Sequence, residues 1–328
     1  MNKLYFLDIS SGKNHKSITG EACGASEYQF YTLIKKLSLK YECLCFHNTK
    51  RPKTIDGISY FPIKELKNVN NEKILLLRFI PSKKSELYCT LRNNNIFLYC
   101  QDINFDKVYN WADNDNSEED LHEINPFLVC VSNYHKDVFV SSSTKKLNII
   151  TIYNSLINEE FSKRRIEKDP FLITYASAWS KGIKLVLEKC EEIYRKDRRY
   201  KLNILSPGYA DNNQIDLPDN TTIVGRMDKE KYSELIMKSL CVIMPKFNES
   251  CGVVAIESNY LGTPVICDHK SGAVPEIINS NFAINYEDEM FETVEKIRNS
   301  QKTCSSIVDE RFNLERNVKK WEELLTSR

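Results

Sequence analysis

The sequence lacks long hydrophobic runs and an excess of either charge. No stretch approaches the ~18 consecutive apolar residues of a membrane span, and the first apolar run, Leu4–Leu7, is too short for the core of a secretory signal. Lysine and arginine together number 46, against 45 aspartate and glutamate residues, which leaves a net charge of +1. We therefore expect no membrane span and no nucleic-acid partner, and any anion binding must be local.

The usual spacings of metal and disulfide sites are also missing. The 11 cysteines are scattered and form no C-x-x-C pair, and the 5 histidines share no metal-ligand spacing. One acidic pair, Asp113 and Asp115, stands in a polar stretch and is interpreted as solvated. We expect reduced thiols, a cytoplasmic location and no metal ion.

Short apolar runs alternate with helical patterns along nearly the whole chain. Apolar side chains recur with helical spacing in two stretches, 30–37 and 183–193. The strand candidates are Leu4–Ile9, Cys43–Phe46, Ile74–Leu77, Ile96–Cys100, Phe127–Val131, Ile149–Tyr153, Phe171–Tyr175, Leu202–Leu205, Cys241–Met244 and Thr263–Cys267. This alternation predicts an α/β protein with parallel sheets covered on both faces. No G-x-G-x-x-G follows a strand, which argues against a dehydrogenase.

The charged segment Asn158–Asp169, followed by a proline, interrupts this alternation and is interpreted as a linker. We predict two Rossmann-like, doubly wound domains, an acceptor-side domain at 1–157 and a nucleotide-binding domain at 168–310. Residues 311–328 then form a final helix with one apolar face. Its apolar positions are Leu314, Val318, Trp321 and Leu325.

The strongest motif places two glutamates eight residues apart. Glu249 lies in a loop after a buried strand, and Glu257 lies inside the helix that begins near Gly252. The amides at this helix N-terminus belong to Cys251, Gly252 and Val253. They favour an anion such as a pyrophosphate, and glycine lets it approach closely. Glu257 is placed to accept hydrogen bonds from a ribose, and Glu249 to reach hydroxyls beyond the phosphates. Alternatively, the acids complement the helix dipole.

This stretch and the two that follow it resemble the signature of retaining glycosyltransferase family 4, within the group 1 glycosyltransferases. Residues Tyr260–Ile266 are similar to the family's A-x-G-x-P-V, and Lys270–Glu276 to its G-G-x-x-E loop, with Ser271 replacing the first glycine. The resemblance implies a GT-B fold, in which two Rossmann-like domains face a cleft and the C-terminal helix crosses back to the first domain. It assigns Glu249 to the donor sugar and Glu257 to the nucleotide ribose.

Two cations are candidates for contacting the donor phosphates. Lys181 follows a strand end within Thr174–Gly182 and can neutralise a departing diphosphate, although a solvated lysine at a helix end is the alternative. The family pattern G-R-x-x-x-x-K-G has Ala176 in its arginine position here. Arg226 is the candidate replacement, because the resemblance places its loop beside the nucleobase, and a surface arginine is the alternative.

Before the first predicted helix, Gly24-Ala25-Ser26-Glu27 resembles the family's G-G-x-E loop, which faces the donor phosphates; Ala25 replaces the second glycine. Ser26 and Gln29 have the spacing of a capping box. We therefore include Gly24 and Ala25 among the donor-binding candidates.

At another strand end, Gln101 stands where the family has histidine, so no imidazole acts there. Asp102 follows at an edge where open α/β sheets bind ligands. We interpret Asp102 as orienting a sugar or acceptor hydroxyl, with a strand-end cap as the alternative. His135, at a helix start, is interpreted as structural.

Together these features predict a metal-independent glycosyltransferase that moves a sugar from a nucleotide-diphosphate sugar to an acceptor hydroxyl and retains the anomeric configuration. The acceptor, whether glycan, lipid or protein, and the oligomeric state are left open. Two alternatives stand. Substitutions at Ala25, Gln101 and Ala176 allow a degenerate GT-B protein that binds nucleotide-sugar or a partner without turnover, and a nucleotide-sugar epimerase has the same fold.

Overall fold

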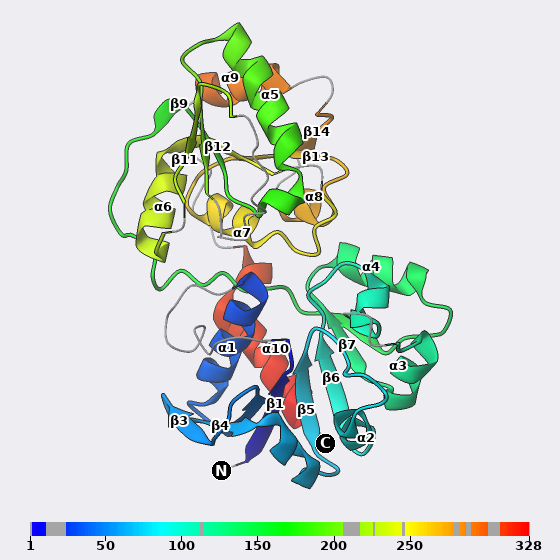
Figure 1. Cartoon of the computed structure of the whole chain (residues 1–328). Helices are drawn as coiled ribbons and strands as arrows, with labels where there is room; N and C mark the ends of the chain where they lie inside the picture. The colour runs from blue at the N-terminus through cyan, green and yellow to red at the C-terminus, as the bar shows by residue number, and fades with distance from the viewer. Residues whose placement is uncertain are drawn as a thin grey trace. The chain divides into compact units, whose positions relative to one another are not determined.

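The computed structural model (Figure 1) describes residues 2–10, 24–111, 115–205, 217–225, 227–244, 247–278, 283–286, 290–300 and 309–327. The chain divides into two compact units. Unit 1 is Met1–Ser155 with Asn313–Arg328, and unit 2 is Leu156–Phe312. Over these described ranges, no helix combines the length and apolarity needed to cross a membrane.

Unit 1 is built on an eight-stranded sheet in the order β3-β4-β2-β1-β5-β6-β7-β8. Its strands are β1 (Lys3–Asp8), β2 (Glu42–His47), β3 (Lys53–Ile55), β4 (Ile58–Pro62), β5 (Lys73–Leu77), β6 (Asn95–Tyr99), β7 (Phe127–Cys130) and β8 (Ile149–Thr151). All neighbours pair in parallel except β3 and β4, which are antiparallel. From β1 the strand order grows in one direction to β2 and in the other to β5, so the switch point lies between β1 and β5.

Helices connect and cover this sheet. They are α1 (Ala25–Leu37), α2 (Glu86–Arg92), α3 (Glu118–Ile124), α4 (Asn133–Ser142) and α10 (Leu314–Thr326), with 3₁₀ turns η2 (Ile63–Asn68) and η3 (Phe105–Val108). The C-terminal helix α10 returns to unit 1 and lies alongside α1 (Figure 1). Its buried Trp321 packs edge-on against Tyr99, with ring centroids 4.8 Å apart.

The predicted capping box at the start of α1 is wrong. Gly24 is the N-cap residue and no side chain caps the helix, while Ser26 lies within the first turn. Gln29 instead pairs with the backbone of Ser155, donating from Nε2 at 2.7 Å and accepting from the amide at 2.9 Å. The buried amide satisfies two backbone groups far away in the sequence, and this outcompetes a local cap.

Unit 2 contains a six-stranded sheet in the order β11-β10-β9-β12-β13-β14, with every pair parallel. Its strands are β9 (Asp169–Tyr175), β10 (Lys201–Ile204), β11 (Thr221–Ile223), β12 (Ser239–Ile243), β13 (Val265–Asp268) and β14 (Ala283–Ile284). The predicted α/β class with parallel sheets is confirmed. The segment before β9 packs on this unit, because the Ser162 amide donates to Ser233 Oγ at 2.8 Å.

The helices of unit 2 are α5 (Ile183–Lys196), α6 (Lys229–Lys238), α7 (Val253–Tyr260), α8 (Val274–Ile277) and α9 (Met290–Ser300), with 3₁₀ turns η5 (Trp179–Lys181) and η7 (Glu310–Phe312). The face of α5 that its periodicity predicted is buried against the strands. These buried positions are Ile183, Val186, Leu187, Cys190 and Ile193. The loops that carry the predicted site follow the carboxyl ends of β9 and β12.

Candidate active site

The structure brings Lys181 and Glu249 together in unit 2. Lys181 ends the 3₁₀ turn after β9, and Glu249 lies in the loop between β12 and α7. Lys181 Nζ donates to Glu249 Oε1 at 2.6 Å, and the ammonium lies 5.5 Å from the ring centroid of Phe247. The glutamate side chain is 9% exposed and the lysine 35%, so the pair is reachable from solvent on its cationic side.

The backbone at Glu249 is held by the segment that resembles the family's glycine loop. The Ala273 amide donates to the Glu249 carbonyl at 2.9 Å. Gly272 has φ +63°, and a Cβ there would lie 2.4 Å from both the amide nitrogen and the carbonyl oxygen of Glu249. A side chain at position 272 therefore meets a backbone conformation and a space that both favour glycine. This close approach fixes the backbone position from which the Glu249 side chain extends.

Helix α7 begins next to this loop. Gly252 is its N-cap residue, with φ +75°, and its carbonyl accepts from the Ala255 amide at 2.9 Å. A Cβ on Gly252 would lie 2.9 Å from a methyl group of Val274, so glycine also lets α7 approach α8 closely. Cys251, Gly252 and Val253 thus stand where predicted, at the positive end of the helix dipole.

Glu257 lies in the second turn of α7 and is 4% exposed. Lys229 Nζ donates to its Oε1 at 2.5 Å. Burial, and after it the charge of Glu257, raise the pKa of the neighbouring Tyr232 hydroxyl well above its ordinary value. The first turn of α7 holds no acidic residue. The dipole alternative therefore fails, because both glutamates are buried, paired with lysines and outside that turn.

Lys229 was missed by the sequence analysis. It is the first residue of α6, where the helix dipole disfavours a cation, and its ammonium lies 4.8 Å from the Tyr232 ring centroid. A lysine at the first helical position, after the aspartate that caps the helix, was the available signal. Arg226, predicted to lie beside the nucleobase, is outside the described residues.

The remaining predicted residues lie in unit 1. Gly24 caps α1 with φ −65°, so its backbone does not require glycine, and Ala25 is the first helical residue. Asp102 follows β6, where Arg78 Nη1 lies 3.7 Å from its Oδ2. Arg78 also donates to Glu27 Oε1 at 2.9 Å. Arg78 was missed as well.

Two neighbours of Asp102 have structural contacts. Gln101 exchanges hydrogen bonds with the side chain of Asn154 in both directions, at 3.2 Å each. His135 is fully buried, and its Nδ1 accepts from the Val131 amide at 3.4 Å. Burial lowers the pKa of His135 to about 3, so the imidazole is neutral at physiological pH. The structural interpretation of His135 agrees with this environment.

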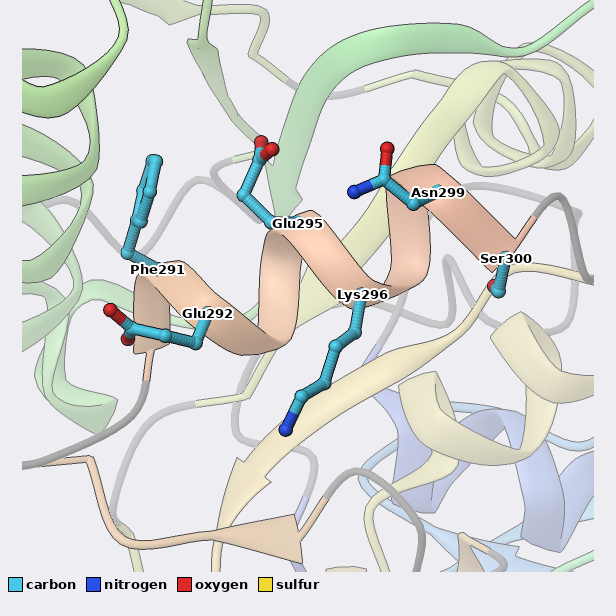
Figure 2. Close-up of a pocket in the computed structure, with 6 residues that line it drawn as sticks. All are labelled: Phe291, Glu292, Glu295, Lys296, Asn299 and Ser300. Carbon is cyan, nitrogen blue, oxygen red and sulfur yellow. The ribbon is translucent and has the colours of Figure 1, made fainter.

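A hollow on the surface of unit 2 contains none of the predicted residues. Figure 2 shows its lining, which comes from α9 alone. The residues are Phe291, Glu292, Glu295, Lys296, Asn299 and Ser300. Glu292 pairs with Lys196, and Glu295 accepts a hydrogen bond from the Tyr200 hydroxyl, so these acidic side chains already have structural partners. Among the described residues there is also no cluster of three or more histidine, cysteine, aspartate or glutamate side chains suited to a metal ion. Asp115, of the acidic pair, is exposed and pairs with Lys84, while Asp113 lies outside the described residues.

Known proteins are similar to this chain in sequence over unit 2 and in structure over the whole chain. Residues 157–313 match the family model described as Glycosyl transferases group 1. Sucrose-phosphate synthase from Thermosynechococcus elongatus has a TM-score of 0.67 at 12% identity, with 99% of this chain and 98% of that chain covered. HepE from Anabaena, in complex with UDP-glucose, has a TM-score of 0.68 at 14% identity over 100% of both chains.

A third structure is the pneumococcal O-GlcNAc transferase GtfA in complex with UDP and GlcNAc, with a TM-score of 0.59 at 12% identity over 84% of this chain and 62% of that one. No curated protein sequence matches. The structural likeness extends over both units, and the family match spans unit 2. Residues 157–313 are thus similar to the group 1 glycosyltransferases, and the likeness of the whole chain to solved structures shows the GT-B fold.

Proposed function

We propose that this protein is a glycosyltransferase, which transfers a sugar from a nucleotide-diphosphate sugar to an acceptor hydroxyl and retains the anomeric configuration. The observation that carries the proposal is the Lys181–Glu249 ion pair at 2.6 Å in the loops beside the N-terminus of α7. A donor supplies partners for both halves of this pair: its diphosphate takes the ammonium, and a hydroxyl of its sugar donates to the carboxylate. The structures of HepE and GtfA contain UDP, which makes uridine diphosphate sugars the first donors to test.

The ribose is assigned to Glu257. Its carboxylate is almost fully buried, and Lys229 occupies one of its oxygens, Oε1. An ionised carboxylate has about four acceptor positions, so a ribose diol can donate to the oxygen that the lysine leaves. The lysine offsets the buried negative charge and orients the carboxylate, because an unpaired buried charge is costly.

In the proposed reaction, the bond from the anomeric carbon to the phosphate oxygen breaks while a bond to the acceptor oxygen forms on the same face. The acceptor proton passes to the departing diphosphate, the nearest base. Lys181 and the amides of Cys251, Gly252 and Val253 stabilise the negative charge that develops there. We propose that these groups take the place of a metal ion. The described cysteines are free thiols, which supports placing the enzyme in the reducing cytoplasm.

The test is a thermal-unfolding panel of nucleotide-sugars, with and without EDTA, followed by donor hydrolysis with each ligand that binds. A donor at 100 times its Kd stabilises the protein by about 2.7 kcal/mol. We expect one donor to bind and to hydrolyse slowly in EDTA, and proton NMR of the first product to show the anomer of the donor. Glu257→Gln should lose the binding, while Glu295→Gln on α9 serves as the matched control. Binding without hydrolysis or transfer would favour the degenerate alternative, and an inverted product would contradict retention.

A further inference from the structure

Three charged side chains meet at the carboxyl edge of the unit 1 sheet. Arg78 directly follows β5 and Asp102 closely follows β6, while Glu27 lies in the first turn of α1, the helix after β1. Strands β1, β5 and β6 are consecutive in the sheet, and the strand order switches between β1 and β5. Open α/β sheets bind ligands at this edge, outside the strand ends at a switch point.

Arg78 connects the other two. One terminal nitrogen donates to Glu27 Oε1 at 2.9 Å, and the other lies 3.7 Å from Asp102 Oδ2. A third nitrogen, Nε, is shielded from solvent and makes no hydrogen bond within the described residues. The side chains of Arg78, Glu27 and Asp102 are 18%, 20% and 33% exposed, so a ligand can reach them.

The backbone of Arg78 is held in an unusual conformation. Its φ is +74°, a left-handed value that costs a residue with a side chain about 1–2 kcal/mol. The Arg78 amide donates to the Tyr99 carbonyl at 3.0 Å, which ties this conformation to the end of β6. Backbone strain of this kind concentrates at ligand sites, where the surrounding structure maintains it.

The balance of charge indicates the ligand. Two carboxylates face one guanidinium, so the cluster carries a net charge of −1 and a phosphate group would be repelled by the unneutralised carboxylate. A sugar hydroxyl suits it better, because one oxygen accepts from the guanidinium while its hydrogen is donated to a carboxylate. Next to Arg78 in sequence, the buried Phe79 stacks on Trp111 with ring centroids 4.8 Å apart and planes 6° apart.

We propose that Glu27, Arg78 and Asp102 form a saccharide-binding site in unit 1, which takes uncharged sugar hydroxyls and discriminates against phosphorylated sugars. The identification of this saccharide as the acceptor rests on the proposed function. The site itself belongs to unit 1 alone, so its binding is measured without a nucleotide-sugar.

The experiment is saturation-transfer NMR and calorimetric titration of the full chain with glucose, galactose, N-acetylglucosamine, maltose and lactose, and with the 6-phosphates of the three monosaccharides. We expect at least one uncharged sugar to bind, and its phosphate to bind at least about 10-fold more weakly. Arg78→Lys keeps the charge but loses the planar fork, and should weaken sugar binding about 10- to 100-fold. Arg92→Lys, in an exposed pair with Glu123, is the matched control.

Glu27→Gln tests whether charge repulsion, rather than the shape of the site, excludes the sugar phosphates. It removes one negative charge, so the sugar phosphate should gain affinity relative to the uncharged sugar, whereas Glu123→Gln should leave the ratio as it is. The proposal is overturned if no sugar binds, if the phosphates bind wild type more tightly, or if Arg78→Lys binds like wild type while its unfolding temperature is unchanged. A parallel UDP-glucose titration reports on unit 2, so failure of the donor assignment is seen separately.

Discussion

Gly272→Ala tests whether the close approach of two loops places Glu249. The new Cβ would lie 2.4 Å from Glu249 N and O and 3.0 Å from the carbonyl carbon of Asn248. Real Cβ contacts are longer, and the obstacles are backbone atoms that cannot rotate away. Forcing extra atoms into a packed site costs about 1–3 kcal/mol, and the left-handed backbone, φ +63°, costs alanine about 1–2 kcal/mol more. We expect the free energy of unfolding of unit 2 to fall by about 2–5 kcal/mol.

Gly225→Ala is the matched control, because Gly225 lies in the same unit with φ +76°, but a Cβ added there would have no atom of the described residues within 4 Å. It should cost only the ~1–2 kcal/mol of the backbone. Calorimetry resolves the difference, since 1 kcal/mol shifts the unfolding temperature of a unit this size by ~2–4 °C. Gly272→Ala should also weaken donor binding, because relief of the clash moves Glu249 relative to Lys181. Equal unfolding temperatures for the two variants would refute the contact argument.

Three further perturbations address the ion pairs and acid stability. Lys181→Ala should lower turnover about 10²- to 10³-fold, as the loss of one electrostatic donor does, and an unchanged rate constant would remove its role. Lys229→Ala leaves the buried Glu257 carboxylate without its cation and should cost about 1.5–3 kcal/mol in urea unfolding. Adding Glu257→Gln should recover part of this loss, and a purely additive double variant would contradict the pairing. Burial would raise the pKa of Glu118, but hydrogen bonds from neighbouring hydroxyls and an amide lower it to about 2. Since its folded pKa is depressed, its contribution is present above the unfolded value of about 4.3 and is lost as pH falls toward 2. Acid titration by circular dichroism should therefore show Glu118→Gln less stable than wild type at pH 7 and equal to it near pH 2.

The long central strands are predictable from the sequence because strands buried on both faces require continuous apolar runs. Strands β3 and β4, a short antiparallel pair at the edge of the unit 1 sheet, were missed. Their connection is Asp56-Gly57, with φ values of +51° and +78°. An Asp-Gly pair is a strong hairpin signal, but the partly polar strands around it gave no continuous run. Strands β11 and β14 were missed because they contain only 3 and 2 residues, too few for a recognisable apolar run.

Some site residues are predictable from a short stretch of sequence, whereas their interaction partners are distant in sequence. Glu249, Gly252 and Glu257 lie within one short stretch. Its residue pattern predicts the strand, the loop and the helix in sequence order, so the three positions follow from that stretch alone. The partners of such residues come from elsewhere: Lys229 precedes Glu257 by 28 positions, and Arg78 follows Glu27 by 51. No periodicity connects positions so far apart, and only the packing of separate elements brings them together.

The burial of Glu257 explains why the sequence alone does not distinguish Lys229 from the other basic residues. Among the 46 lysines and arginines, most have no property that distinguishes them in sequence. Glu257 is 4% exposed, and a buried carboxylate is costly unless a cation or several hydrogen-bond donors pair with it. The requirement for Lys229 therefore follows only once Glu257 is known to be buried, which the folded unit shows and the sequence does not. Arg78 is informative in a similar way: it has a left-handed backbone at a strand end, hydrogen-bonds Glu27 and pairs with Asp102. A solvated surface would not maintain the cost of that backbone conformation.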